Sequence, residues 1–349
     1  MKIIIKSKFK NYTVKDIKKL SFKKSENNFY LIDKNVYKKI LKKKIKGKLI
    51  ILNTSEKLKN YYEIGKIIKK LINLKVRKNS IIIAIGGGIV QDIAGFISSI
   101  LFRGIQWNFY PSTLLSQGDS CIGAKTSINF ADAKNQLGNF YPPSKIFIFT
   151  NFLKYLKKKD IFSGLGELAH YFLISNSKDW NFYIFNLKKF LSEKNKNKNK
   201  ILQKLIFRSL LIKKKFIEKD ELDTGKRLIL NYGHSFGHSI EKLTNYKIPH
   251  GLAVTHGINI ANFFSLKLKL MNYKNFKDIE KIISKIVDLN EISKLNSENF
   301  VNALKKDKKN IGNSFRLILS KGVGKMFIKK INNQNTIKNL LKDYLKYVQ

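Results

Sequence analysis

The sequence predicts a wound α/β domain followed by a helical second half. Up to about residue 155, short apolar runs typical of buried strands alternate with segments of helical periodicity. After residue 160, apolar residues recur at helical spacing instead. A chain of 349 residues is long enough for two such domains.

In the first half, strands are expected where apolar residues run without interruption. Residues 80–85 (SIIIAI) form such a run, as a central strand of a parallel sheet does. Residues 60–76 have the spacing of an amphipathic helix, and another helix is expected after the glycines at 86–88. The other expected strands are residues 2–6, 28–32, 48–53, 105–110 and 145–150.

The second half is expected to be helical almost throughout. A small hairpin is expected at residues 315–328, and a closing helix at residues 335–347. The expected helices before them are residues 161–175, 180–192, 201–219, 228–244, 252–270, 275–288 and 298–306.

The net charge is +45, from 69 Lys and Arg against 24 Asp and Glu. A nucleic-acid-binding protein is one interpretation, because basic surfaces bind phosphates. The lysines are spread over the whole chain together with Asn, Ile and Phe, as in a protein from an AT-rich genome, and no nucleic-acid motif is present. We therefore expect no specific nucleic-acid partner, only an attraction for anionic substrates.

Membrane insertion and disulfide formation are not expected. No apolar run approaches the length that crosses a bilayer, and the N-terminal residues lack the pattern of a signal peptide. The single cysteine, Cys121, excludes an internal disulfide. These features are consistent with a cytoplasmic protein.

The histidines gather in one segment: four of the five lie between residues 228 and 256. His234 and His238 are four residues apart, so on a helix they share one face. A break at Pro249 allows His250 to return toward them. Because a catalytic zinc typically takes three protein ligands, with imidazole prominent among them, we predict a metal site. Two partly exposed histidines and an unrelated third are the alternative.

Residues before the histidines supply further groups. Glu167, in GLGELAHY, would be a buried carboxylate in an apolar stretch unless a metal or base pairs with it. We predict it as the oxygen ligand beside His234 and His250. On one continuous helix, Arg227, Asn231 and His234 would form a stripe. This stripe indicates an anionic, oxygen-rich substrate, because arginine can hold a carboxylate through two hydrogen bonds.

Glycines and charged residues follow several expected strands. GGGIVQD (residues 86–92) joins a strand to a helix, and its free N–H groups suit a pyrophosphate. The segment lacks the GxGxxG pattern, so a tight turn is the alternative. TSEKLK (residues 54–59) offers Glu56 for a ribose hydroxyl and Lys59 for a phosphate, and Asp33 could meet another hydroxyl. Taken singly, these residues can equally be helix caps or surface charges.

Residues 111–143 are expected to form a polar loop. The loop carries Asp119, Lys125, Lys134 and Asn135 among small residues and glycines. It follows a buried strand of an α/β domain, where ligands usually bind. An exposed loop is the alternative, but exposure explains neither the glycines nor the apolar residues between them.

Together these segments resemble the 3-dehydroquinate synthase family, within the wider group of sugar-phosphate cyclases. They run in consistent order from about residue 80 to 310, while TSEKLK and Asp33 fit more loosely. The segments are GGGIVQDIAGF, FRGIQWNFYPSTLLSQGDSCIGAKTSIN, AKNQLGNFYPP, SGLGELAHY, DELDTGKRLILNYGHSFGHSIE, PHGLAV and KKDKKN.

The resemblance implies an α/β N-terminal Rossmann-like dinucleotide-binding domain, residues 1–158, and an all-α C-terminal domain, residues 159–349, that binds metal and substrate. It implies a cytoplasmic homodimer of the shikimate pathway with catalytic NAD and zinc or cobalt. The implied reaction converts 3-deoxy-D-arabino-heptulosonate 7-phosphate to 3-dehydroquinate and phosphate. It proceeds by transient oxidation, phosphate elimination, re-reduction and aldol closure.

The resemblance also implies roles by position. Glu167, His234 and His250 would bind the metal, and Lys213 and Arg227 the substrate carboxylate. Asp119 would meet a ring hydroxyl. The residues implied around the phosphate are Lys125, Asn135, Asn231, His238 and one lysine of the pair Lys308 and Lys309, with Arg103 reaching in from a partner subunit. Those implied at NAD are Asp33, Glu56, Lys59, Gly87, Gly88, Asp92, Ser112, Thr113, Lys125 and Lys134.

Four positions depart from the family pattern. His170 stands where lysine is usual, Asp223 where glutamate is usual, Leu252 where glutamate commonly follows His-Gly, and Thr54-Ser55 where Asp-Gly is usual. The exchange at His170 concerns the choice of substrate more than the reaction class. A related sugar-phosphate cyclase with another substrate is therefore one alternative, and a metal-dependent polyol dehydrogenase, which shares the two-domain plan, is the other. The pairing of Arg227 with Asn231 favours the dehydroquinate reaction.

Overall fold

The chain forms two compact units. The first consists of residues 1–156 and 206–223, and the second of residues 157–205 and 224–349. The boundary predicted after residue 158 stays a prediction, and the sequence did not indicate that residues 206–223 belong with the first unit. The computed structural model describes residues 1–22, 24–42, 44–131, 133–192, 197–305 and 314–349.

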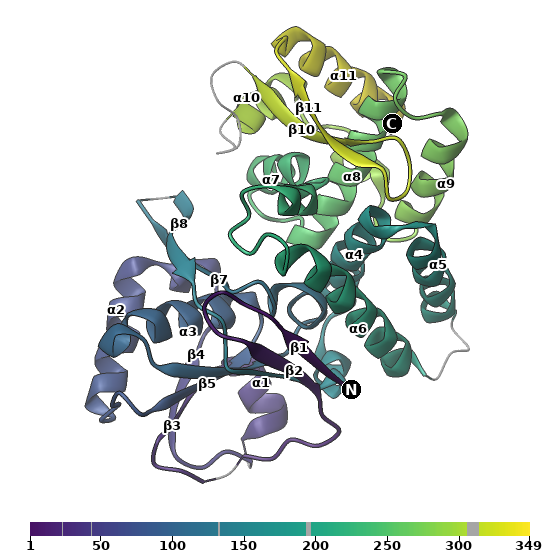
Figure 1. The fold of residues 1–349 in the computed structure, drawn as a ribbon. Coiled ribbons are helices and arrows are strands. Elements are labelled where there is room, and N and C mark those ends of the chain that lie inside the picture. The colour runs from purple at the N-terminus through teal and green to yellow at the C-terminus, as the bar shows by residue number, and fades with distance from the viewer. Residues whose placement is uncertain (23, 43, 132, 193–196, 306–313) are drawn as a thin grey trace. The chain divides into compact units, whose positions relative to one another are not determined.

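A seven-stranded sheet forms the centre of the first unit (Figure 1). Its order is β1-β2-β9-β6-β5-β3-β4, with β1 antiparallel to β2 and the other neighbours parallel. The strands are β1 (Lys2–Ile5), β2 (Tyr12–Asp16), β3 (Asn28–Asp33), β4 (Lys48–Leu52), β5 (Ile81–Gly86), β6 (Gln106–Pro111) and β9 (Lys145–Ile148). Six of these were predicted. β2 was missed because only Tyr12 and Val14 face the core, so no continuous apolar run marks it.

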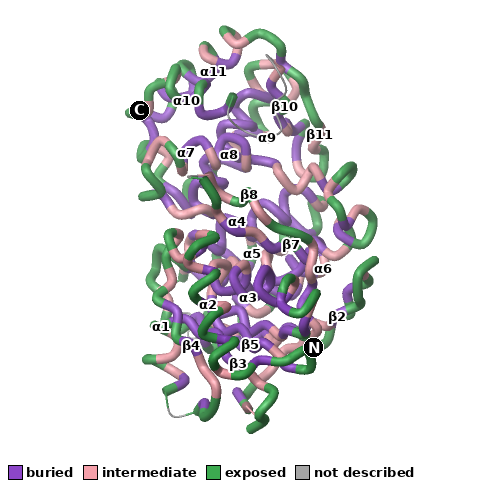
Figure 2. The backbone as a smooth tube through the Cα atoms, turned by 90° about the vertical axis from the view of Figure 1, so that its left-hand side faces the viewer, coloured by how far each residue is buried: buried purple, intermediate pink, exposed green. Residues whose placement is uncertain are grey.

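The apolar run of β5 is buried because the strand lies between β3 and β6 in the sheet. The helix α3 (Gly88–Ile100) follows β5 directly and packs against it. Figure 2 shows buried backbone gathered in β3, β5 and α3. The amphipathic helix α2 (Tyr61–Asn73) buries Ile64, Ile67 and Leu71 on one face, at the predicted spacing.

The strand order places a ligand-binding position between β3 and β5. From β3 the chain moves outward to β4, whereas from β5 it moves to β6 on the other side. In open α/β sheets, ligands bind beyond the carboxyl ends of the strands at such a switch point. The last residues of these two strands, Asp33 and Gly86, and the following Gly87 and Gly88 therefore lie where the fold favours a ligand.

The prediction of one loop for residues 111–143 was wrong. Residues Lys125–Phe130 form β7 and residues Ala133–Phe140 form β8, paired as an antiparallel hairpin. Thr126 and Ile128 are buried, while the polar residues Lys125, Ser127 and Asn129 alternate with them. This alternation is a strand signal, but the surrounding glycines and lysines obscured it in the sequence.

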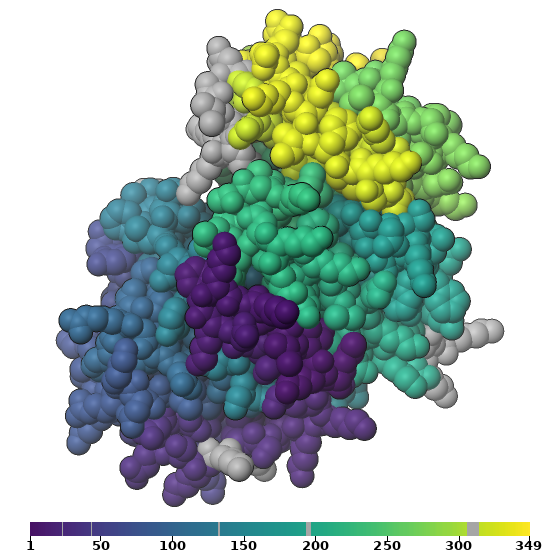
Figure 3. Space-filling view, in the orientation of Figure 1, coloured from purple at the N-terminus to yellow at the C-terminus, as the bar shows by residue number. Residues whose placement is uncertain are grey.

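The segment that returns to the first unit lies in and after α6 (Lys198–Ile217). Ser209 donates a hydrogen bond to the carbonyl of Gly118 at 2.8 Å. The N-terminal residues, dark purple in Figure 3, lie on the surface, and the amide of Lys6 donates to Glu218 Oε1 at 2.7 Å. These bonds join residues 206–223 to the sheet domain.

The second unit is helical with one hairpin, as predicted. Residues 251–265 of α8 are all buried, so α8 is its central helix. None of the helices in the described residues is long and apolar enough to cross a membrane. Besides α8 (His250–Lys267), the elements are α4 (Lys158–Ser175), α5 (Ser177–Leu191), α7 (His234–Leu243), α9 (Tyr273–Ile283), α10 (Ser297–Lys305), β10 (Phe315–Ser320), β11 (Met326–Ile331) and α11 (Gln334–Tyr347).

Candidate active site

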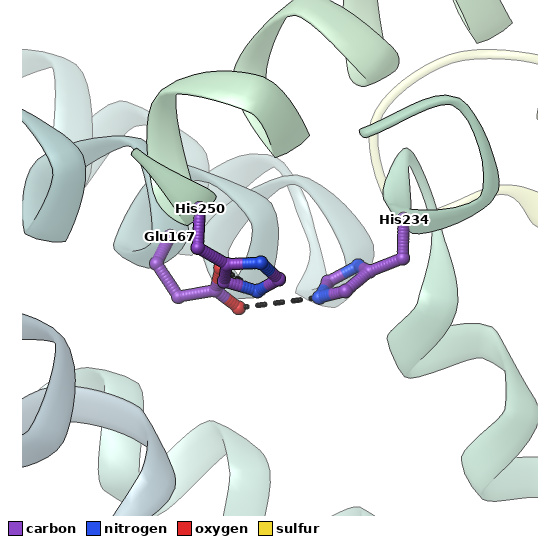
Figure 4. A group of neighbouring side chains, drawn as sticks. All are labelled: Glu167, His234 and His250. Atoms are coloured by element: carbon purple, nitrogen blue, oxygen red, sulfur yellow. Dashed lines mark ion pairs between the residues drawn. The ribbon is translucent and has the colours of Figure 1, made fainter. Parts of the chain in front are cut away.

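Three helices of the second unit bring Glu167, His234 and His250 together (Figure 4). Glu167 lies in α4, and the two histidines are the first residues of α7 and α8. Nε2 of His234 is 3.6 Å from Oε1 of Glu167, and Nε2 of His250 is 3.7 Å from Oε2. One ligand atom from each residue lies within 4.8 Å of the others. The predicted donors therefore share a single centre, as one metal ion requires.

Glycines allow α4 and α8 to approach closely beside these donors. A Cβ at Gly166 would lie 2.5 Å from the carbonyl oxygen of Gly251, and one at Gly251 would lie 1.9 Å from that of Ser163. The amide of Gly251 also donates to Ser163 Oγ at 3.1 Å. Glu167 directly follows Gly166, and His250 directly precedes Gly251. The distance between Glu167 and His250 therefore depends on this contact between the two helices.

Each histidine of the centre also contacts an oxygen through its other ring nitrogen. Nδ1 of His234 is 3.3 Å from the carbonyl oxygen of Tyr232. Nδ1 of His250 is 3.2 Å from Oε2 of Glu241, which lies in α7. Such contacts fix the tautomer that leaves Nε2 available to a metal. Glu241 was not predicted from the sequence, although its spacing from His234 places both on one face of α7.

The prediction of one helical stripe for Arg227, Asn231 and His234 was wrong. Residues Lys226–Asn231 form the short 3-10 helix η6, and α7 starts only at His234. Between them Gly233 has φ of 80°, and a Cβ there would lie 2.6 Å from the side chain of Ile258. Arg227 and Asn231 therefore precede the histidines in a separate turn, where Arg227 is buried.

His170 is fully buried in α4. Its ring packs edge-on against His234, with centroids 5.2 Å apart, and against Tyr171 at 4.8 Å. The ring of His238 lies 5.8 Å from that of His250 at 27°, in a stacked arrangement. The rings of four of the five histidines, His170, His234, His238 and His250, thus form one connected cluster in the second unit. Within it, His170 packs against the predicted ligand His234.

Polar residues predicted for NAD cluster beyond the carboxyl ends of the strands in the first unit. Asp33 accepts hydrogen bonds from the amides of Asn35 and Val36, so it caps a helix, and it also accepts one from Thr54. Nζ of Lys59 lies 2.5 Å from Oδ2 of Asp92. Burial raises the pKa of Asp92, while the ammonium of Lys59 opposes this rise.

The start of α3 is open to a ligand. A Cβ at Gly88 would meet no described atom within 4 Å, whereas one at Gly87 would lie 3.0 Å from Thr113 Cγ2. The amide of Ser112 donates to the carbonyl of Gly86 at 2.8 Å, which holds the end of β6 beside this turn. Glu56 accepts a hydrogen bond from Asn129 Nδ2 at 2.8 Å. Nζ of Lys134 is 3.7 Å from the carboxylate of Glu56.

The other predicted substrate residues of the first unit form pairs. Nζ of Lys213 is 2.6 Å from Oδ1 of Asp119. Nζ of Lys125 is 2.5 Å from Oδ2 of Asp223. The amide oxygen of Asn135 accepts from Nζ of Lys59 at 2.6 Å, so it belongs to the cluster beyond the strand ends.

Two of the phosphate contacts implied by the resemblance, the lysine pair and Arg103, are not tested by the structure. The pair Lys308 and Lys309 lies outside the described residues. Arg103 ends a 3-10 turn with φ of 59°, is exposed, and follows the exposed Phe102. Its reach into a partner subunit stays a prediction.

Comparison with known proteins identifies relatives that match both the α/β part and the helical part of the chain. The family models described as 3-dehydroquinate synthase N-terminal and C-terminal match residues 49–163 and 164–310. The chain is 38% identical over 322 residues to the 3-dehydroquinate synthase of Pelagibacter ubique, covering 90% of this chain and 86% of that protein. It is 36% identical over 340 residues to that of Dictyoglomus thermophilum, covering 97% and 92%.

Solved structures show the same fold. One is 2-deoxy-scyllo-inosose synthase complexed with carbaglucose-6-phosphate, NAD+ and Co2+. Its TM-score with this chain is 0.87 at 22% sequence identity, covering 98% of this chain and 100% of that one. The predicted fold class, an α/β dinucleotide-binding domain with a helical domain, is thereby confirmed. On the family models and the relatives, the chain belongs to the 3-dehydroquinate synthase family.

Proposed function

We propose that this chain converts 3-deoxy-D-arabino-heptulosonate 7-phosphate to 3-dehydroquinate and phosphate. Two relatives that this chain matches over 86% and 92% of their length carry the name of that activity. The observation that carries the proposal is the single centre formed by Glu167, His234 and His250. Its donors come from segments that belong to the family's C-terminal model.

The donor set fits a divalent metal. One carboxylate and two imidazoles are three protein ligands, which is typical of catalytic zinc sites that leave a position for substrate. Glu167 is 1% exposed, and a buried carboxylate is stable only with a compensating charge or hydrogen bonds. We therefore propose that these three residues bind Zn2+ or Co2+, as Co2+ is bound in the inosose synthase complex.

The strand ends of the first unit fit NAD. The start of α3, which has open space beside Gly88, can bind a pyrophosphate through the amide N–H groups of Gly87 and Gly88. Asp33 and Glu56 offer carboxylate oxygens that can accept hydrogen bonds from ribose hydroxyls. The remaining residues that we propose here are Lys59, Asp92, Ser112, Thr113, Lys125 and Lys134.

The chain's own residues mostly bind and orient a single substrate. When bound, the metal polarises the hydroxyl being oxidised, and NAD carries the hydride away and back. The buried guanidinium of Arg227, with Lys213, provides the charge for a carboxylate. Asp119 can accept a hydrogen bond from a ring hydroxyl. For the phosphate we propose Lys125, Asn135, Asn231 and His238.

Orientation matters because elimination and ring closure follow each other on one bound molecule. A fixed geometry holds the reacting groups of this one molecule in the orientation that each step requires and excludes side reactions. The protein thus needs few acid–base groups of its own, which agrees with a site made mainly of charge-bearing ligands and hydrogen-bond donors.

Release of inorganic phosphate tests the proposal. The purified protein, given the heptulosonate phosphate, NAD and zinc, should release phosphate without net formation of NADH. A His234→Ala variant is the control. Release no greater than in this control would reject the proposal. Net NADH from a polyol would instead indicate a dehydrogenase, and turnover of glucose 6-phosphate or sedoheptulose 7-phosphate a related cyclase.

A cytoplasmic homodimer, as the family resemblance implies, is part of the proposal. Sedimentation equilibrium measures its mass directly. Specific nucleic-acid binding is not proposed, because the lysines are spread along the chain. Sequence-independent binding that weakens steeply with salt would reflect the charge alone.

A further inference from the structure

His250 presents its two ring nitrogens to two different carboxylates. Nε2 lies 3.7 Å from Oε2 of Glu167, inside the predicted metal centre. Nδ1 lies 3.2 Å from Oε2 of Glu241, on the opposite side of the ring. Glu241 has no part in the function proposed above, and its side chain is 14% exposed.

We propose that Glu241 is a positioning residue for the metal centre. Its carboxylate accepts the Nδ1–H of His250, which selects the tautomer with the lone pair on Nε2. The ring then has one orientation in which Nε2 faces Glu167. A carboxylate in this position also makes the imidazole a stronger ligand. The inference rests on the proposed metal site, because it concerns how that site is held.

His250 needs this restraint more than His234 does. The side chain of His234 is 13% exposed and its Nδ1 lies near the backbone carbonyl of Tyr232, whose position the helix start fixes. The side chain of His250 is 35% exposed. Because the His250 ring is the more exposed of the two, it has more rotational freedom, and the carboxylate of Glu241 is the group that limits it.

The placement of Glu241 also connects two helices of the centre. Glu241 lies in α7, seven residues after His234, so both lie on one face of that helix. His238 lies between them and stacks on His250. The helix α7 thus supplies one ligand itself and restrains the ligand supplied by α8.

A direct role for Glu241 is the competing arrangement. His238, Glu241 and His250 also place one ligand atom each within 4.8 Å of one another. Burial favours the centre at Glu167, because that carboxylate is 1% exposed whereas all three members of the other group are partly exposed. Burying the charge of Glu167 costs more free energy than partly burying that of Glu241, so a divalent ion offsets the larger cost when it binds at Glu167.

The zinc affinities of three variants test the inference without any measurement of activity. They are measured by competition with a chromophoric chelator. Glu241→Ala removes the acceptor, whereas Glu241→Gln keeps an oxygen that can accept the Nδ1–H but loses the charge. Glu291→Gln is the matched control. Glu291 faces His256 at 3.5 Å, a carboxylate–imidazole pair of the same unit that includes none of the three proposed ligands. Circular dichroism and the melting temperature verify that each variant is folded.

Glu241→Ala should weaken zinc binding about 10- to 100-fold, as is typical for partners of metal-bound histidines. Glu241→Gln should lose less, and Glu291→Gln should bind as the wild type does. With cobalt, the visible absorption of Glu241→Ala should shift because the His250 ring is reoriented. Wild-type zinc affinity and an unchanged cobalt spectrum in Glu241→Ala would overturn the inference.

Two further outcomes also contradict it. Complete loss of zinc binding in Glu241→Ala, with binding retained in Glu167→Ala, would make Glu241 a ligand rather than a positioning residue. Wild-type zinc affinity in Glu167→Ala, His234→Ala and His250→Ala would reject the metal centre itself, and with it both proposals. A folded Glu241→Gln protein keeps the test decisive even where Glu241→Ala fails to fold.

Discussion

Replacement of Gly166 by alanine perturbs the metal centre through helix packing alone. The new Cβ would lie 2.1 Å from Thr255 Oγ1 and 2.5 Å from the carbonyl oxygen of Gly251. The threonine side chain can rotate, but the carbonyl belongs to the backbone of α8. Ordinary contact therefore requires α4 and α8 to separate by roughly 1 Å, because packed interiors hold no spare volume.

This separation acts on two quantities. The overpacked contact should lower the free energy of unfolding by about 1–3 kcal/mol, less the small gain from removing a helical glycine. It also moves Glu167 away from His250, since these residues directly adjoin the two glycines. A displacement of this size can cost about 100-fold in activity. Zinc affinity should fall as well.

Denaturant unfolding, zinc competition and phosphate release measure the three effects. Gly65→Ala is the matched control, because Gly65 lies within α2 and a Cβ there would meet no described atom within 4 Å. That variant should be as stable as the wild type or more stable by about 0.5–1 kcal/mol, with unchanged activity. If Gly166→Ala behaved like Gly65→Ala in all three assays, the close helix contact would not determine the geometry of the centre.

Three other predictions concern separate features. Asp33→Ala should weaken NAD binding, measured by fluorescence titration, and should lower the free energy of unfolding by about 1 kcal/mol because the helix cap is lost. Asp33→Asn should retain most of the cap. Equal NAD affinity in both variants and the wild type would exclude Asp33 from the nucleotide site. Zinc at 100 times its dissociation constant should stabilise the protein by about 2.7 kcal/mol and raise its melting temperature, and Glu167→Ala should abolish that shift; a full shift in the variant would contradict the assigned ligand. The imidazole of His256, 3.5 Å away, lowers the pKa of the Glu291 carboxyl below its ordinary value of 4.5, so the stabilisation from this pair is present above pH 4.5 and is lost as the pH falls through the lowered pKa. Glu291→Gln should thus be less stable at pH 7, by at most about 1 kcal/mol because the Glu291 side chain is 40% exposed to solvent, and the difference should vanish in acid. A difference that persists in acid would show a cause other than charge.

Local patterns in the sequence determined most of the elements. The apolar run of β5 specifies a buried strand by itself, and the spacing in α2 specifies a helix with one buried face. Pro249 sets the start of α8 at His250, because proline suits the residue before a helix. The histidine segment, the apolar residues around Glu167 and the resemblance to a family likewise predicted Glu167 as a third ligand.

Tertiary structure decided the contacts between distant segments. Whether the stripe at Arg227 continued into α7 depended on the space beside Gly233, which Ile258 fills from another helix. The contact of Glu241 with His250 depends on how α7 and α8 pack, and that of Gly166 with Gly251 on how α4 meets α8. Helical periodicity shows which residues share a face, but it does not show which face of another helix they meet. Only the folded chain fixes that choice, because it is made by side-chain volumes from segments far apart in sequence.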